Sequence, residues 1–157
     1  MHLIQSWKDG HSGRGSSALS RRAYLDITHR PVRVALTRLL LGEHCLAVAL
    51  LRHPTRTHRR VERHDRLCRF GDGAVEDELH ALFSCRGTEV LVRERDRFWK
   101  ELRDRGLEAE VRRLTRFEGG SRAVSLLTEK VETATVLAWF CDKVLSIFKE
   151  RQIYRMY

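Results

Sequence analysis

The chain has 157 residues, of which 42% are hydrophobic and 32% are charged. This length suits one globular domain with a modest core and argues against two domains. The longest apolar run, residues 45–51, is far shorter than the roughly 20 residues that span a bilayer, and residues 1–15 lack the apolar stretch of a secretory signal. We therefore expect an intracellular protein, nuclear or cytoplasmic, without a membrane partner.

Positive charge is concentrated in the first half of the sequence. Of the formal net charge of +9, residues 1–70 carry the whole excess, with 14 Lys or Arg against 5 acids, whereas residues 71–157 have 16 of each. Residues 52–69 are the densest part. Arginine pairs with phosphate through two parallel hydrogen bonds and stacks on bases, so this cluster is typical of nucleic-acid contact, although an arginine-rich codon bias would give the same excess. The residues predicted to contact RNA or DNA are Arg52, Arg56, Arg59, Arg60, Arg63 and Arg66.

The predicted fold is mainly α. Residues 1–20, rich in glycine and serine, are expected to form a flexible lead-in, and residues 21–157 a single helical domain. A helix is predicted to begin at Pro31 and to end at Gly42, because apolar residues between them follow helical spacing. Residues 45–51 predict a second, largely buried segment.

The second half starts with a turn and continues as helices. An extended piece around Cys68 and the turn signal Asp72-Gly73 predict a short β-hairpin, and the acids that follow suit the first turn of a helix. Another helix is predicted at residues 88–105, and helical structure over the last 35 or so residues. The strongest apolar stripe in the sequence lies there and consists of Leu137, Cys141, Val144, Leu145 and Phe148. The predicted class is thus a small helical domain with a short β-hairpin or zinc-knuckle-like insertion.

The insertion, residues 66–85, has the spacing of a zinc knuckle with one ligand missing. Cys68, His80 and Cys85 match the pattern C-x2-C-x8-H-x4-C, but Gly71 stands where the second cysteine belongs. A knuckle needs two ligands on a tight turn and two on or just after a short helix. Because positions i and i+5 of a regular helix diverge, the histidine and the second cysteine can converge only if the cysteine lies at or just beyond the helix end.

Zinc binding at this segment requires a fourth donor, since Zn²⁺ prefers four ligands at tetrahedral corners. Asp72, His64 or a water molecule can supply it. The alternative is that the two cysteines are small buried residues and the histidine makes an internal hydrogen bond. Replacing Gly71 by cysteine would complete the pattern, and we predict that Gly71→Cys binds zinc at least tenfold more tightly, equivalent to about 1.4 kcal/mol.

The same segment carries a resemblance to a known family. RLCRFGDGAVEDELHALFSC, preceded by RVALTRLLLGEHCLAV and followed by LVRERDRFW, resembles the zinc-binding region after the polymerase in reverse transcriptases of non-LTR retrotransposons, especially fungal ones. The resemblance covers residues 24–100 and, more weakly, 134–154. It implies a C-terminal fragment with a degenerate knuckle and a role in contacting template RNA or target DNA, and it does not imply catalysis. The zinc ligands that it implies are Cys68, His80 and Cys85.

No enzyme class fits these residues. A polymerase needs paired metal-binding aspartates, whereas residues 24–27 offer only YLDI, and a Cys–His hydrolase would need a third orienting group. We therefore expect a non-catalytic nucleic-acid-binding accessory domain. The alternative is a helical protein-interaction module that acts through its C-terminal apolar helix. Charged substitutions at Leu137 and Phe148 separate the two, and we expect them to unfold the chain because the stripe is core.

Overall fold

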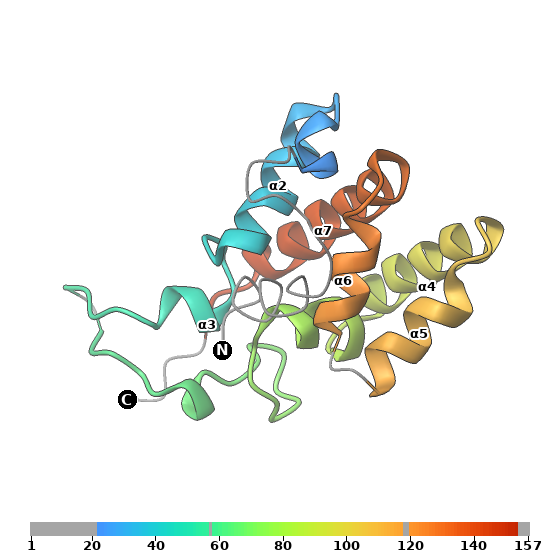
Figure 1. Cartoon of the computed structure of the whole chain (residues 1–157). Helices are drawn as coiled ribbons and strands as arrows, with labels where there is room; N and C mark the ends of the chain where they lie inside the picture. Colours follow the sequence, from blue (N-terminus) through green and yellow to red (C-terminus); the bar gives the residue numbers. More distant parts are fainter. Residues whose placement is uncertain (1–21, 57, 118–119, 154–157) are drawn as a thin grey trace.

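The computed structural model describes residues 22–56, 58–117 and 120–153, and it is mainly helical, as predicted (Figure 1). The predicted lead-in, residues 1–20, lies outside the described residues. No helix in those three ranges is long and apolar enough to cross a membrane. In chain order the elements are the 3-10 turn η1 (Ala23–Asp26), α2 (Arg30–Leu41), α3 (Ala47–Leu50), the 3-10 turn η2 (Arg63–Asp65), the π-helix η3 (His80–Ser84), α4 (Glu89–Asp104), α5 (Glu108–Phe117), α6 (Ser121–Leu127) and α7 (Val131–Glu150).

The helices α2 and α4 have nearly the predicted bounds. α2 has a proline in its first turn and ends at Gly42, whose N–H donates to the Leu39 carbonyl over 3.2 Å. α4 begins after Thr88, whose side-chain oxygen accepts a hydrogen bond from the N–H of Leu91 and so caps the helix. The buried segment predicted at residues 45–51 contains a single helical turn, α3.

Helix α7 is the centre of the fold. It contacts α2, α4, α6, η1 and η3, and Figure 1 shows it between α2 on one side and α4 and α6 on the other. Four residues of its predicted apolar stripe are buried, and Leu145 is partly buried against the same core. The stripe is therefore core, and its surface is already covered by the neighbouring helices.

Helix α5 lies in a stretch where the sequence pattern indicates no element. Its ten residues include five charged ones, and only Val111 and Leu114 are buried. α5 packs against α4 and α6 through this narrow face. Two apolar positions three residues apart are too few to establish a helical period, so tertiary packing rather than pattern identifies this helix.

The predicted β-hairpin is wrong: residues 66–85 contain no strand. A single bridge joins Leu67 to Val75, flanked by a 2.8 Å hydrogen bond from the N–H of Cys68 to the Ala74 carbonyl. The turn between them is wide because the chain first folds back at Gly71, whose N–H donates to the Cys68 carbonyl over 2.9 Å. This early reversal leaves room for only one paired position, so a knuckle turn replaces the ladder.

The part of the basic segment between α3 and η2, residues 51–62, forms a loop that leaves the helical body and returns to it (Figure 1). The N–H of Val61 donates to the carbonyl of Leu51 over 3.1 Å and closes the base of this loop. Arg66 reinforces the closure, since it donates to the carbonyls of Val61 and Val48 over 2.9 and 2.8 Å. The loop is thereby held beside the knuckle turn.

Candidate metal centre and basic hollow

Four side chains converge at the knuckle turn. Cys68, Asp72, His80 and Cys85 each present one possible ligand atom, and these atoms all lie within 4.8 Å of one another. The two sulfur atoms are 3.7 Å apart. Tetrahedral zinc with Zn–S bonds of about 2.3 Å would place two thiolate sulfurs about 3.8 Å apart. The cluster can therefore hold a metal ion, and its donor set and sulfur spacing fit zinc.

His80 is the member of the cluster that most needs a further partner. Its side chain is 10% exposed, and its Nε2 lies 3.0 Å from an oxygen of Asp72. The contact is close, but it does not have the geometry of a hydrogen bond, so Nε2 is a buried nitrogen without a hydrogen-bond partner among the described residues. Such a group is costly unless something else satisfies it. A cation between Nε2 and the carboxylate would do so.

The electrostatics of the cluster favour a cation. Burial lowers the pKa of His80, but the neighbouring Cys85, Asp72 and Asp77 raise it, and the net pKa lies above its ordinary value. A hydrogen bond with the Cys68 thiol, opposed by burial and aided by His80, lowers the pKa of Cys85 to about 5. Cys68 keeps its proton in this pair, because its pKa is raised by the same hydrogen bond and by burial. The lowered pKa of Cys85 favours the thiolate form that a cation would bind.

The π-helix η3 explains how His80 and Cys85 meet. The N–H of Cys85 donates to the His80 carbonyl over 2.8 Å, a hydrogen bond across five residues. On a regular α-helix these positions would point about 140° apart. Cys85 itself has left the helix, with φ −59° and ψ 127°. The prediction that Cys85 lies just beyond the helix end agrees with this geometry, and η3 widens the last turn so that both side chains face Cys68.

The cluster is held by two similar turns in contact. The backbone amide of Phe70 hydrogen-bonds to Cys68, and that of Gly87 hydrogen-bonds to Cys85, so each sulfur is paired with the amide two residues ahead. The turns meet so closely that a Cβ added at Gly87 would lie 2.0 Å from the Cβ of Phe70. Only glycine fits there, and the sequence pattern gave no role to this residue.

Of the two protein candidates for the fourth ligand, the structure places Asp72 in the cluster. His64 lies on η2 with its side chain 81% exposed, and its Nε2 is 3.4 Å from Asp65. Gly71, at the missing cysteine position, is exposed and has a φ of 83°. The carboxylate that follows this turn therefore takes the place that a cysteine holds in the full pattern.

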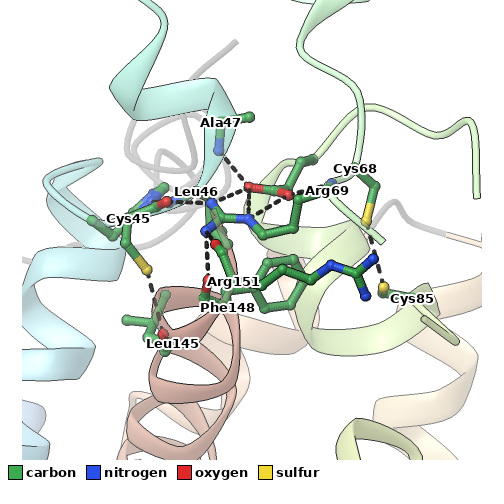
Figure 2. Close-up of polar contacts among 11 residues, drawn as sticks. Cys45, Leu46, Ala47, Cys68, Arg69, Cys85, Leu145, Phe148 and Arg151 are labelled. Atoms are coloured by element: carbon green, nitrogen blue, oxygen red, sulfur yellow. Dashed lines mark hydrogen bonds and ion pairs between the residues drawn. The ribbon is translucent and has the colours of Figure 1, made fainter. Parts of the chain in front are cut away.

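A buried ion pair stabilises the turn. Arg69, next to the ligand Cys68, donates through Nε and one terminal nitrogen to Glu76, with a closest N–O distance of 2.6 Å. Its remaining donors reach the carbonyls of Cys45, Phe148 and Arg151 (Figure 2). The turn is thereby tied to α3 and to the end of α7.

Other buried charges around the cluster were also missed by sequence reasoning. Glu78, expected in a solvated first helical turn, is buried and accepts a 3.0 Å hydrogen bond from His44 Nε2. Arg95 of α4 is buried and donates to the carbonyls of Leu82 and Ala81, at 2.7 and 3.2 Å, within η3. Charged side chains are rarely buried, so composition does not predict that these two are. The only signal in the sequence is that Glu78 lies close to His80.

The six arginines predicted to contact nucleic acid fall into two groups. Arg56, Arg59 and Arg60 are exposed on the loop, and Arg63 is exposed but donates to Asp77 over 2.8 Å. Arg52 is partly exposed and lies 3.7 Å from Glu43. Arg66 is only 5% exposed and its donors reach backbone carbonyls, so the structure gives it a structural contact instead.

The loop and the knuckle turn enclose a hollow of about 1330 Å³. Arg56, Arg59 and Arg60 line it from the loop, and Cys68 and Gly71 line it from the turn. Neither Arg56 nor Arg59 has an ion-pair partner in the part of the chain that the structure describes. Arg60 lies 3.8 Å from Glu62, which lines the hollow together with Asp65, so the unpaired positive charge beside the cluster is that of Arg56 and Arg59.

Comparison with known proteins gives no further identification: no family model matches the chain, and no curated protein or solved structure is significantly similar to it.

Proposed function

We propose that this chain is a nucleic-acid-binding module in which a structural zinc ion holds the turn that borders the basic hollow. The ligands are Cys68, Asp72, His80 and Cys85. The observation that carries the proposal is that this turn and the exposed arginines of the loop line the same hollow. The resemblance of residues 66–85 to the zinc-binding region of non-LTR reverse transcriptases implies the same pair of properties.

Zinc has a structural role in this proposal. Four protein ligands complete a tetrahedral shell, and such closed sites contribute folding energy rather than catalysis. Zinc, when bound, cross-links Cys68 and Asp72 of the turn to His80 and Cys85 at the two ends of η3, which lie 8 to 17 residues further along the chain. The ion also satisfies the buried Nε2 of His80. Metal binding is thus coupled to the shape of the hollow.

The zinc half of the proposal is tested by native mass spectrometry of the full chain. We expect one zinc per chain, lost after chelation together with a fall in melting temperature. Cys85→Ser should bind no stable zinc. Cys45→Ser is the matched control, because Cys45 is outside the cluster and a serine can still donate to the Leu145 carbonyl. Equal metal content in both variants, or none in the parent, would reject the site.

The nucleic-acid half is tested by filter binding over a salt series. The variant Arg56→Gln/Arg59→Gln/Arg60→Gln should bind RNA or DNA more weakly, and its salt slope should fall by roughly 2–3, since each lost phosphate contact removes about 0.7–0.9. The charge-matched control changes three exposed arginines elsewhere, Arg97, Arg105 and Arg116. An equal loss in both variants would show attraction to the overall charge and not to the hollow.

A further inference from the structure

The volume of the hollow indicates the size of ligand that it can hold. Its volume of about 1330 Å³ exceeds the roughly 300–1,000 Å³ of pockets for small molecules. It is bounded by residues 54–56 and 58–62 of the loop, by residues 67–71 and Gly73 of the turn, and by Arg151 and Ile153 beyond α7. A space of this size suits an extended ligand that lies between loop and turn.

The lining of the hollow combines arginines with apolar side chains. Leu67 is 38% exposed, and Val61, Phe70 and Ile153 are partly exposed in the same space. A nucleic-acid duplex keeps its bases stacked inside and offers phosphates to a protein surface, so it has no use for an apolar hollow. A single strand offers both phosphates and free base faces, and proteins bind such strands with cationic grooves that contain aromatic platforms.

Phe70 and Arg151 form a platform of this kind. The guanidinium carbon of Arg151 lies 5.3 Å from the centroid of the Phe70 ring, which packs edge-on against Phe148 at 4.9 Å. The backbone of Arg151 is fixed, because its carbonyl accepts a 2.7 Å hydrogen bond from Arg69. The guanidinium lies over the Phe70 ring and the ring packs on Phe148, so a base can stack on the exposed side of this Phe70–Arg151 pair.

We infer that the hollow binds a single-stranded segment of nucleic acid, with its phosphates on Arg56, Arg59 and Arg60 and a base on the platform of Phe70 and Arg151. This inference rests on the proposed function and specifies the class of ligand. Binding of this kind involves no contacts in the groove of a duplex. In a single-stranded ligand the base contacts are largely independent of sequence.

The test is fluorescence anisotropy with the zinc-loaded full chain and three probes of one sequence: a 12-nucleotide RNA, the same DNA strand and the DNA duplex. Both single strands should bind at least tenfold more tightly than the duplex. Phe70→Leu, which keeps the apolar volume, should weaken single-strand binding about tenfold through the loss of stacking. Its salt slope should stay unchanged, because no charge is removed.

Two further measurements distinguish the possible failures. If Phe70→Leu does not fold, Arg151→Gln removes the other half of the platform while keeping the backbone carbonyl that Arg69 binds, and it should weaken single-strand binding severalfold with a slope change of one contact or less. Equal or tighter binding of the duplex, or unchanged affinity in a folded platform variant, would overturn the inference and leave the proposed function intact. Absence of binding to all three probes would overturn both.

Discussion

Arg69 and Glu76 form an ion pair whose side chains are 3% and 0% exposed. Glu76 also accepts hydrogen bonds from the N–H groups of Ala47 and Arg69 itself, at 2.7 and 2.8 Å. Every donor of the guanidinium therefore has an acceptor, and the carboxylate has several donors. Such a pair is tolerated in the interior only because its hydrogen bonds are complete.

Arg69→Gln should lower the free energy of unfolding by about 3–5 kcal/mol, because it leaves the Glu76 charge buried without its partner. Urea unfolding of the zinc-loaded chain measures the change. Arg103→Gln is the control, since it breaks a pair with Glu108 in which the arginine side chain is 64% exposed and the glutamate keeps a second partner, Arg112, and it should cost little. Similar losses in both variants would mean that the buried pair has no special role.

Asp72→Ala should weaken zinc binding about tenfold or more, since a carboxylate ligand is replaced by water. A competition assay with a chromophoric chelator measures the affinity. Asp104→Ala removes an exposed carboxylate at the end of α4, outside the cluster, and should leave it unchanged. If Asp72→Ala binds zinc as tightly as the parent, the fourth ligand is solvent.

A cysteine placed at the fourth position should tighten zinc binding. The spacing pattern predicts this gain for Gly71→Cys, but Gly71 has a φ of 83°, which would strain a cysteine by roughly 1 kcal/mol. Because Asp72 already reaches the cluster, we expect a gain of at least tenfold for Asp72→Cys and a smaller one for Gly71→Cys. The same competition assay ranks the two variants, and the reverse order would place the fourth ligand at position 71.

Gly87→Ala should destabilise the chain and weaken zinc binding together. The added Cβ would overlap Phe70, and forcing the two turns apart should cost roughly 1–3 kcal/mol or more. Gly73→Ala is the comparison, because Gly73 has a φ of 75° but open space around its Cβ, so only backbone strain of roughly 1 kcal/mol applies. Thermal melts with and without zinc should show the larger zinc-dependent loss for Gly87→Ala.

Stability should fall above pH 9 because of Cys141. Burial, and to a smaller extent Asp142, raises the pKa of this thiol above its ordinary value of 9.0. Above pH 9 the unfolded thiol ionises while the folded one keeps its proton, so its contribution is complete below pH 9 and decreases by up to about 1.4 kcal/mol per pH unit above it. The stability difference between the parent and Cys141→Ala should therefore shrink by about 1.4 kcal/mol from pH 8 to pH 10. For Val144→Ala, on the same face of α7, the difference should stay constant.

The three spaced members of the cluster were predictable from the sequence, whereas the fourth was not. Cys68, His80 and Cys85 stand at separations that a knuckle turn and a helix end can bring together, and the structure brings them together. Asp72 and His64 each lie four residues from Cys68, so spacing along the chain does not decide between them. The choice depends on the direction of the turn after Cys68 and on the exposed position of η2, and both are consequences of tertiary packing.

The buried charged residues were likewise not predictable from the sequence. Arg66 and Arg69 lie three residues apart in one basic cluster with Arg63, and nothing in composition separates them. Arg63 is exposed, whereas the other two have their guanidinium groups inside the fold. Their acceptors include the carbonyls of Val48 and Phe148, 18 and 79 residues away along the chain, which no local pattern can reveal.

The hydrogen bonds from Arg69 to the carbonyls of Phe148 and Arg151 span 79 and 82 residues of sequence. An excised fragment of residues 60–90 would contain all four residues of the cluster but would leave that arginine without these acceptors, so we expect the turn to lose its shape outside the domain. During translation at about 5–20 residues per second, roughly 4–16 s pass between synthesis of Arg69 and of Arg151. For that interval the nascent chain presents Cys68 and Cys85 before the carbonyls that hold the neighbouring Arg69 in place have been synthesised.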